Sequence, residues 1–514
     1  MTRTRNLRRA LVVIAGLAAA SVTLSACLFS PIVPQPIPTK TPSADGVAAN
    51  VASFYTQTLS WSSCGTGFDC TSVTAPLDWQ NPEAGTITLA VIRHRATNGT
   101  ALGSLLTNPG GPGASGYDLI QQSLDYAVGS ELQKTFDVIG FDPRGVGRST
   151  AVTCYDAKQM DSYLFDLVPA PRGSATWTSD LVASQKAFGA ACEQNSSGLL
   201  PYITTDQAAR DMDLLRGVLG DKKLNYLGYS YGTFLGATYA KLFPQNVGRM
   251  VLDGALDPSV SGLDVSTTQA IGFQSALRAY MTNCLAGSSC PFTGTVDQAL
   301  ASLGDLLAQV DKTPITNADG RKLGADSLVT GIVAALYSKD SWPVLSSALA
   351  AVKSGSAAQA FRLVDFYYNR SSNGVYQDNS TEAFEAYNCM DYPQVTSQAL
   401  KDASKAEIAA KAPTIAPYWS GPDPCAVWPI TATGVREKIS APGAPPIIVI
   451  GTTNDPATPY VWAKSLAEQL SSGVLITHEG EGHTAFNKGS SCVDDAVVTY
   501  FETGTPPQNG LTCQ

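Results

Sequence analysis

The stretch from Leu224 to Leu235 constrains the fold of this chain more than any other part of the sequence. It opens with apolar residues suited to a short buried strand and continues as Gly228-Tyr229-Ser230-Tyr231-Gly232. An apolar, helix-like segment from Phe234 to Leu242 follows. Two glycines around a serine between a strand and a helix permit a sharp turn that exposes the serine hydroxyl. The pentapeptide alone is a weak signal, and the rest of the chain decides what it means.

Short β-prone runs alternate with helical stretches along much of the chain. The strand candidates are 86–95, 103–108, 136–141, 224–228, 247–252, 446–451 and 474–477, and Ala208 to Leu219 has helical spacing. This alternation predicts an α/β fold with a mostly parallel sheet and helices on both faces. The pattern changes between Ser259 and Pro429, where strand-like runs are scarce and stretches such as 267–280, 296–310 and 345–364 are rich in Ala, Leu, Ser and Gln. We therefore expect a helical cap inserted into the sheet domain.

These patterns give the following expected organisation. Residues 1–26 form a signal peptide and residues 27–47 a tether rich in proline, serine and threonine. The core then runs over 48–258, the helical cap over 259–429 and the second part of the core over 430–514.

The first residues have the features of an export signal. Four arginines within the first nine residues precede a short apolar run from Ala10 to Leu24, and the run ends in Leu24-Ser25-Ala26-Cys27. Small residues before a cysteine resemble a bacterial lipobox, which implies cleavage before Cys27 and a lipid anchor on its sulfur. The alternative is an ordinary secretory signal with a cysteine near the cleavage site. Both interpretations predict export, and the first places the protein on the outer face of the cell membrane.

The remaining cysteines agree with export, because an even number of cysteines in an exported protein is typical of disulfides. Pairing sequence neighbours is the simplest hypothesis, although spacing alone leaves the connectivity open: Cys64–Cys70, Cys154–Cys192, Cys284–Cys290, Cys389–Cys425 and Cys492–Cys513. The absence of a C-x-x-C motif and the presence of only three histidines argue against a zinc site or another metal site. With 34 basic and 43 acidic residues, the net charge of −9 argues against a nucleic-acid partner.

A serine nucleophile needs a base, and this chain offers three histidines. His94 lies inside a β-prone run before the serine, and His478 lies at the end of the last predicted strand. His483 follows that strand in a glycine-flanked loop, where parallel sheets place their catalytic groups. We therefore predict His483 as the base, with His478 as the alternative.

The acid that orients the histidine is predicted to be Asp455. It follows the strand candidate 446–451, and the order Ser230, Asp455, His483 is that of the α/β-hydrolases. One alternative is that Asp455 only caps a helix beginning near Pro459. Another is that Asp253, which ends the strand after the serine helix, supplies the carboxylate.

An oxyanion hole needs two backbone donors. One is expected to be the Tyr231 N–H, which directly follows the serine. The other is expected from Asn108-Pro109-Gly110-Gly111-Pro112-Gly113, with Gly110 and Gly111 as the candidates, because glycine lets a backbone approach the substrate closely. A plain turn is the alternative for this glycine-rich loop.

Together these motifs resemble those of prolyl iminopeptidase-type α/β-hydrolases. The resemblance rests on the Gly110–Gly113 loop, the segment Asp142-Pro143-Arg144-Gly145-Val146-Gly147-Arg148-Ser149, the serine turn, Asp455-Pro456-Ala457-Thr458-Pro459 and Gly482-His483. It is strongest to the secreted tripeptidyl aminopeptidases of actinobacteria and their mycobacterial cell-envelope relatives. Asn108-Pro109 stands where the prolyl enzymes have a histidine before the glycines, which weakens a strict proline preference.

The resemblance implies a monomeric serine exopeptidase without a cofactor, which releases short peptides, expected to be tripeptides, from a free N-terminus. Such enzymes bind the substrate ammonium with cap carboxylates, and the candidates here are Glu382, Glu385 and above all Asp391. A solvated acidic face is the alternative for each of them. Two other functions stay open: a cell-envelope esterase or lipase with the same triad, and a catalytically silent binding lipoprotein.

Overall fold

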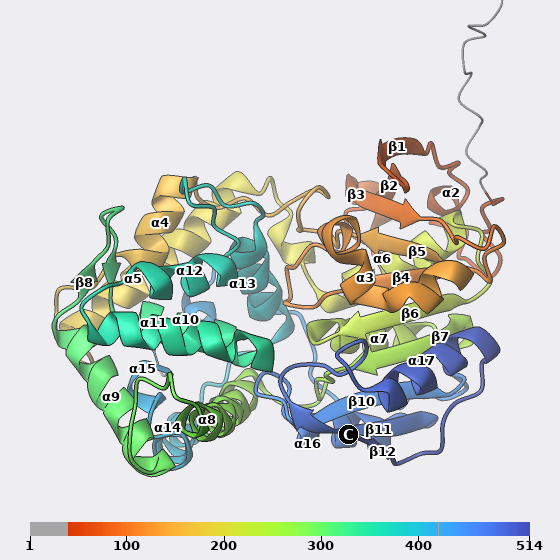
Figure 1. Cartoon of the computed structure of the whole chain (residues 1–514). Coiled ribbons are helices and arrows are strands. Elements are labelled where there is room, and N and C mark those ends of the chain that lie inside the picture. The colour runs from red at the N-terminus through yellow and green to blue at the C-terminus, as the bar shows by residue number, and fades with distance from the viewer. Residues whose placement is uncertain (1–39, 420) are drawn as a thin grey trace, which may run out of the picture. The chain divides into compact units, whose positions relative to one another are not determined.

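A ten-stranded sheet runs through the part of the chain that the computed structural model describes, residues 40–419 and 421–514 (Figure 1). The expected signal peptide, Cys27 and the first part of the expected tether lie outside these residues. In the sheet, the strand order is β1-β2-β3-β5-β4-β6-β7-β10-β11-β12, antiparallel from β1 to β5 and parallel from β5 onward. The strands are β1 (Ser62–Gly65), β2 (Phe68–Pro76), β3 (Thr86–His94), β4 (Ser104–Asn108), β5 (Asp137–Phe141), β6 (Leu224–Tyr229), β7 (Val247–Asp253), β10 (Ile447–Asn454), β11 (Gly473–Glu481) and β12 (Leu511–Cys513).

The register of the central strands brings their carboxyl ends to one level. Asn108 of β4 pairs with Gly228 of β6, and Tyr229 of β6 pairs with Asp253 of β7. Asp253 in turn pairs with Ile450 of β10. The loops that follow these strands therefore begin at the same edge of the sheet, where open parallel sheets form their binding sites.

Helices cover both faces of the sheet. Residues of α3 (Gly116–Thr135) and α17 (Ser491–Thr503) share one buried apolar cluster with the strands. Residues of α2 (Ala52–Tyr55), α6 (Thr205–Val218), α7 (Tyr231–Leu242) and α16 (Tyr460–Gln469) share the other. Side-chain caps begin two of these helices, because Ser115 accepts the Asp118 N–H and Thr204 accepts the Gln207 N–H. The α/β-hydrolase fold class predicted from the sequence is thus confirmed.

A separate group of helices lies between β7 and β10 in the sequence (Figure 1). Most of them share an apolar cluster of their own, but the buried residues Ala383, Ala386 and Tyr387 of α13 belong to a cluster of the sheet domain. The group comprises α8 (Gly262–Ala286), α9 (Val296–Lys312), α10 (Ala325–Leu336), α11 (Trp342–Lys353), α12 (Ala358–Tyr367), α13 (Ser380–Asp391), α14 (Gln398–Lys411) and α15 (Ala416–Trp419), with a short hairpin of β8 (Ile315–Thr316) and β9 (Lys322–Leu323). We call these helices the cap. The helical stretch 345–364 is two helices, because the chain turns at Gly355 with φ +83° between α11 and α12.

Two helices from the first part of the chain contact the cap. Asp161 of α4 (Ala157–Phe165) forms a salt bridge with Arg370. Arg172, just before α5 (Ala175–Asn195), forms salt bridges with Asp311 and Asp326. The segment 157–195, which the sequence pattern placed with the core, therefore packs against the predicted cap.

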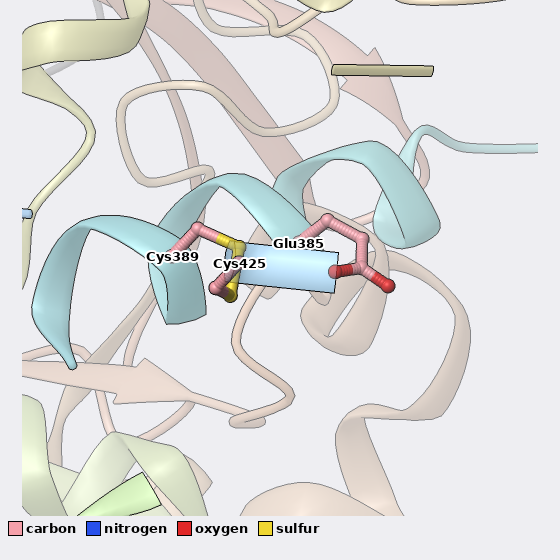
Figure 2. A group of neighbouring side chains, drawn as sticks. All are labelled: Glu385, Cys389 and Cys425. Carbon is pink, nitrogen blue, oxygen red and sulfur yellow. A yellow bond between two sulfur atoms is a disulfide. The ribbon is translucent and has the colours of Figure 1, made fainter. Parts of the chain in front are cut away.

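Five disulfides join the ten cysteines of the described chain in sequence-neighbour pairs. Cys389–Cys425, drawn in Figure 2, fastens α13 to the 3-10 turn Pro424–Val427. Cys492–Cys513 fastens the edge strand β12 to α17. Within residues 40–419 and 421–514, no helix has the length and apolar character needed to cross a membrane.

Candidate active site

Ser230 occupies a strained turn between β6 and α7. Its backbone has φ 55° and ψ −124°, a combination that a residue with a side chain adopts only when its surroundings enforce it. The Ser230 N–H donates to the Asp253 carbonyl over 2.9 Å, and its own carbonyl accepts the Thr233 hydroxyl over 2.6 Å. A Cβ on Gly228 would lie 2.5 Å from the Gly232 carbonyl oxygen, so the turn needs glycine there. The G-x-S-x-G motif therefore has the strand–turn–helix context that its chemistry requires.

The loop after β4 lies directly against this turn. A Cβ on Gly110 would be 2.8 Å from the Ser230 Cβ and 2.6 Å from the Tyr229 carbonyl oxygen. The Gly110 N–H donates to the Asn108 side chain over 2.9 Å. The amides of Gly111 and Tyr231 have no acceptor among the residues described. Of the two loop candidates, Gly110 therefore provides close packing, and Gly111 keeps a free donor beside the serine turn.

His483 and Asp455 form a buried pair. The His483 Nδ1 lies 2.8 Å from Asp455 Oδ2 and 3.0 Å from Oδ1. Asp455 also accepts the amides of Ala457 and Thr458, each over 2.9 Å, and the Thr458 hydroxyl over 2.8 Å. Helix α16 begins beyond this turn, at Tyr460. Asp455 thus braces its own loop and orients the histidine. Thr458, part of the Asp455–Pro459 motif but given no role from the sequence, contacts both members of the pair.

Asp253, the alternative acid, contacts the backbone beside the histidine rather than its ring. Its carboxylate accepts the amides of Ala485 and Phe486 over 2.8–3.0 Å, and its carbonyl accepts the Ser230 N–H. Burial raises the pKa of Asp253 to about 6. One fully buried residue therefore ties the serine turn to the loop that carries His483.

The electrostatics of His483 favour its charged form. Burial alone lowers the pKa of this imidazole, but the charge of Asp455 and their hydrogen bond more than offset burial, so the pKa lies above 6.5. Its Nε2 is buried and has no hydrogen-bond partner in the described structure. The other two histidines lie elsewhere: His94 ends β3 next to the Phe68 ring, and His478 lies within β11. The structure therefore brings His483, rather than His478, to the carboxylate.

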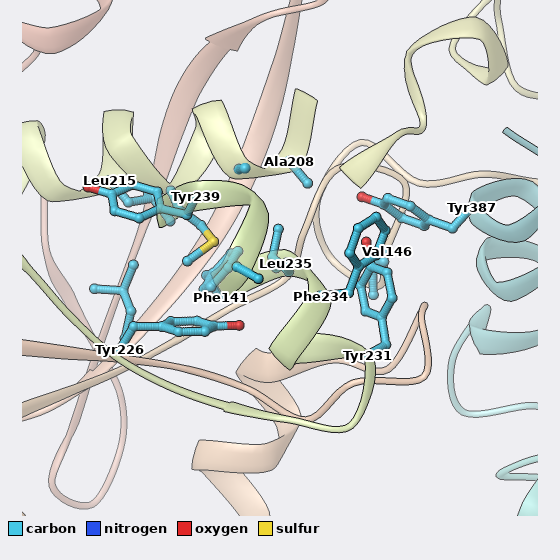
Figure 3. Close-up of a cluster of buried hydrophobic side chains, with 14 of the residues drawn as sticks. Phe141, Val146, Ala208, Leu215, Tyr226, Tyr231, Phe234, Leu235, Tyr239 and Tyr387 are labelled. Atoms are coloured by element: carbon cyan, nitrogen blue, oxygen red, sulfur yellow. The ribbon is translucent and has the colours of Figure 1, made fainter. Parts of the chain in front are cut away.

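Helix α13 of the cap is fastened to the core along its length. Asn379, at its start, accepts the Gly147 N–H and donates to the carbonyls of Gly145 and Val152, each over 2.8 Å. Tyr387, midway, donates to the Arg144 carbonyl over 2.9 Å and packs against Tyr231 (Figure 3). The segment 142–149, part of the sequence resemblance, thus serves as an anchor for this helix.

Asp391, the preferred candidate for binding the substrate ammonium, completes this anchoring. Its Oδ1 accepts the Thr205 N–H over 2.9 Å and its Oδ2 accepts the Thr205 hydroxyl over 2.6 Å. The residue is buried, with 4% of its surface exposed. The Thr205 oxygen also lies 2.5 Å from the Tyr231 hydroxyl. Both carboxylate oxygens of Asp391 are therefore used in holding α13 to the first turn of α6.

Glu382 and Glu385 differ from Asp391 in having no partner on another residue; the Glu382 carboxyl meets only its own backbone N–H. Neither side chain forms a salt bridge or a hydrogen bond with another described residue, and both are half-buried. Burial raises the pKa of each carboxyl to about 7. The helix that carries them touches the glycine loop, because a Cβ on Gly113 would meet the Ser380 carbonyl oxygen at 2.8 Å and the Phe384 nitrogen at 2.9 Å. The two carboxylates thus lie on a helix that packs against the candidate oxyanion loop.

Glu385 also belongs to a group of three potential metal ligands in the described chain, with Cys389 and Cys425 (Figure 2). The two sulfurs are bonded to each other in a disulfide. A disulfide sulfur is not the thiolate that binds metal ions. This group therefore fastens the carboxylate-bearing helix and does not form a metal centre.

A parallel sheet that presents a serine on such a turn, with a histidine–aspartate pair on the neighbouring loops, defines a serine hydrolase of the α/β-hydrolase fold. Comparison with known proteins places the chain more narrowly. Residues 412–513 match the family described as TAP-like protein. The chain is 36% identical over 462 residues to the serine protease Hip1 of Mycobacterium tuberculosis, covering 86% of this chain and 87% of the relative.

Two further relatives cover the chain to a similar extent. Carboxylesterase B of Mycobacterium tuberculosis is 36% identical over 451 residues, 86% of each chain. The tripeptidyl aminopeptidase of Streptomyces lividans is 29% identical over 494 residues, 91% of this chain and 89% of the relative. The chain belongs to this family of TAP-like serine hydrolases, as its sequence motifs predicted.

Proposed function

We propose that the chain is an exported serine exopeptidase that releases short peptides, tripeptides foremost, from the free N-terminus of a peptide. Relatives named serine protease and tripeptidyl aminopeptidase support a peptidase. The pair of unpartnered carboxylates, Glu382 and Glu385, carries the proposal for a free amine. An ammonium group is the ligand that would neutralise these charges, whereas an uncharged acyl chain would leave them unpaired in a half-buried site.

In the proposed mechanism Ser230 attacks the scissile carbonyl while His483 Nε2 takes the hydroxyl proton. Asp455 holds the imidazole through Nδ1 and stabilises its charged form. The amides of Gly111 and Tyr231 bind the oxygen of the tetrahedral intermediate. His483 then gives the proton to the departing amine, the C–N bond breaks, and an acyl-enzyme remains. Water, activated by the same histidine, releases the short peptide.

The test is a matched set of mono-, di- and tripeptide anilides, each with a free and with an acetylated amine. The proposal expects kcat/KM to be highest for the free tripeptide and to fall by about two orders of magnitude on acetylation, because a hydrogen-bonded charge pair is lost. Equal rates on free and acetylated substrates would overturn the exopeptidase proposal. They would leave the serine-hydrolase class intact.

An esterase of the cell envelope is the second candidate, supported by the 36% identity to a relative named carboxylesterase B. The triad chemistry is the same for both, because each proceeds through an acyl-enzyme. A simple acyl ester that is cleaved faster than any free peptide anilide would favour the esterase.

The location of the enzyme is part of the proposal. The lipobox-like Leu24-Ser25-Ala26-Cys27 supports a lipid anchor that holds the enzyme at the outer face of the membrane. Cys27→Ala should release an otherwise active enzyme into the medium or leave its signal uncleaved. Membrane association equal to that of the unmodified chain, with normal signal processing, would remove the lipid anchor from the proposal.

A further inference from the structure

Tyr337 connects the cap to the catalytic histidine. It directly follows α10, and its carbonyl accepts the His483 N–H over 2.8 Å. Its ring meets the imidazole edge to face, with centroids 5.3 Å apart and planes at 86°. A Cβ on Gly482 would lie 3.1 Å from the same carbonyl, so the two chains touch at this point. This cap residue therefore forms one wall of the space beside His483.

The hydroxyl of Tyr337 is not used inside the protein. No described residue forms a hydrogen bond with it, although the ring is half-buried between His483 and Phe273, 6.0 Å away between centroids. Burial raises the pKa of the phenol well above 10, so the group is neutral and can donate as well as accept. Partly buried hydroxyls usually have a partner, and a bound substrate would supply one here.

The placement of the cap helices defines which part of a substrate Tyr337 would meet. Helix α13, with Glu382 and Glu385, lies against the Gly113 end of the oxyanion loop. On the other side, Gln269 of α8 donates to the Ala457 carbonyl over 2.8 Å in the Asp455 loop, and Tyr337 contacts His483. The histidine must reach the leaving nitrogen to protonate it, so the departing group leaves on the His483 side.

We infer that Tyr337 forms the leaving-group subsite: its hydroxyl hydrogen bonds to the first residue of the departing peptide, donating to that residue's backbone carbonyl. The inference rests on the proposed function, because an amine leaving group is a peptide chain. It adds a contact on the far side of the scissile bond from the amine-binding carboxylates. Tyr337 thereby contributes to choosing which bond is cut and to holding the departing amine beside the histidine.

Acyl transfer measures this subsite directly. An acyl-enzyme made from a p-nitrophenyl ester partitions between water and an added amino-acid amide, which must bind where the leaving peptide binds. Tyr337→Phe should lower the ratio of aminolysis to hydrolysis about three- to ten-fold, as expected for loss of one neutral hydrogen bond. The ratio is measured from the common acyl-enzyme, so it does not depend on how fast the ester acylates Ser230. Tyr418→Phe is the matched control. It also removes a tyrosine hydroxyl from the cap, but the Tyr418 ring stacks with Arg172 and not with His483, so the ratio should not change.

A second measurement distinguishes a contact between Tyr337 and the substrate from an effect of Tyr337 on the position of His483. Tyr337→Phe should reduce kcat/KM for a tetrapeptide amide by the same factor as the partition ratio. It should reduce kcat/KM for a tripeptide anilide less, because an aniline has no carbonyl for the hydroxyl to bind. Tyr337→Ala, which also removes the ring, should lower both. A partition ratio in Tyr337→Phe equal to that of the unmodified enzyme would overturn the subsite. Since the acyl donor is a simple ester, this result is independent of whether the free-amine requirement holds.

Discussion

The loops that carry Asp253 and Asp455 differ from helix α13 in whether their carboxylates have hydrogen-bond partners in the protein. In the loops, Asp455 accepts three backbone amides, a hydroxyl and the ring N–H of His483, and Asp253 accepts two backbone amides. On α13, Glu382 and Glu385 have no partner of this kind within the described chain. The loop carboxylates are therefore paired within the described chain, whereas the two glutamates have no cation beside them.

Burial raises carboxyl pKa values in both regions, to about 6 for Asp253 of the loops, which has amide partners. The two glutamates have pKa values of about 7, because burial disfavours their charged form and no cation compensates it. A bound ammonium would restore the ionised state and lower these values. Under the proposed function, the reaction chemistry and the recognition of the amine lie in separate regions, which substitutions should be able to separate.

The largest expected effect comes from removing the nucleophile. Ser230→Ala should reduce turnover of a free tripeptide anilide by at least about three orders of magnitude, since removal of such a serine eliminates the covalent route. Substrate binding, measured by calorimetry, should persist, because the α13 carboxylates are untouched. Turnover near the unmodified level would mean that Ser230 is not the nucleophile, and the contrast between the loops and α13 would no longer describe catalysis and recognition.

Removing a carboxylate of α13 should have a smaller effect on kcat/KM, and only for substrates with a free amine. Glu385→Gln should lower kcat/KM for the free tripeptide anilide about ten- to hundred-fold, mostly through KM, by removing one partner of a charge pair. The acetylated anilide should be cleaved at its original rate. Glu407→Gln on α14, an exposed glutamate paired with Lys411, is the control and should change neither. Equal losses on both substrates would mean that Glu385 supports the catalytic loops instead.

The pH dependence should distinguish the two regions by its steepness. Both the glutamates and His483 must be deprotonated to work, so kcat/KM should fall below pH 7 more steeply than a single ionisation allows, and change less above it. In Glu382→Gln/Glu385→Gln the fall should follow a single proton, because His483 alone remains. An unchanged slope in the double variant would show that the two carboxyls do not titrate in substrate binding.

The same ionisations give a stability test. A carboxyl whose folded pKa exceeds its unfolded pKa binds more protons when folded, so stability falls as the pH rises from about 4.5 to about 7. The double glutamine variant should lose this fall and melt at a higher temperature than the unmodified protein at pH 8. Thermal unfolding at pH 5 and pH 8 measures the difference.

The smallest expected effect on activity comes from the disulfide that fastens α13. Replacing Cys389 and Cys425 together by alanine should destabilise the fold by about 4 kcal/mol, as expected for opening a loop of this length. KM for the free tripeptide anilide should rise only a few-fold, because Asn379, Tyr387 and Asp391 still hold the helix. A loss as large as that of Glu385→Gln would make the disulfide the main determinant of the carboxylate position.

Sequence alone predicted the central strands of the sheet and the pairing of His483 with Asp455, because each depends on local order; β1, β2 and β12 were not among the strand candidates. Polar residues directly after apolar strands, in the sequence order serine, aspartate, histidine, indicate the same edge of a parallel sheet. Prediction was less complete where a role depends on distant packing. Nothing near Asp391 reveals that Thr205 occupies both its oxygens. The Gly110 amide is likewise used by Asn108, and Tyr337 has no motif around it at all.

Helix α13 is anchored at its start by Asn379, at its middle by Tyr387 and at its end by Asp391 and a disulfide. A helix held in this way cannot slide to suit peptides of different size. The position of its carboxylates relative to Ser230 is therefore fixed by the fold. Under the proposed function, a peptide whose amine binds there would present only one of its bonds for cleavage. Such an enzyme would select the bond to cleave by its distance from the amine, and the side chains between the amine and that bond would have little influence.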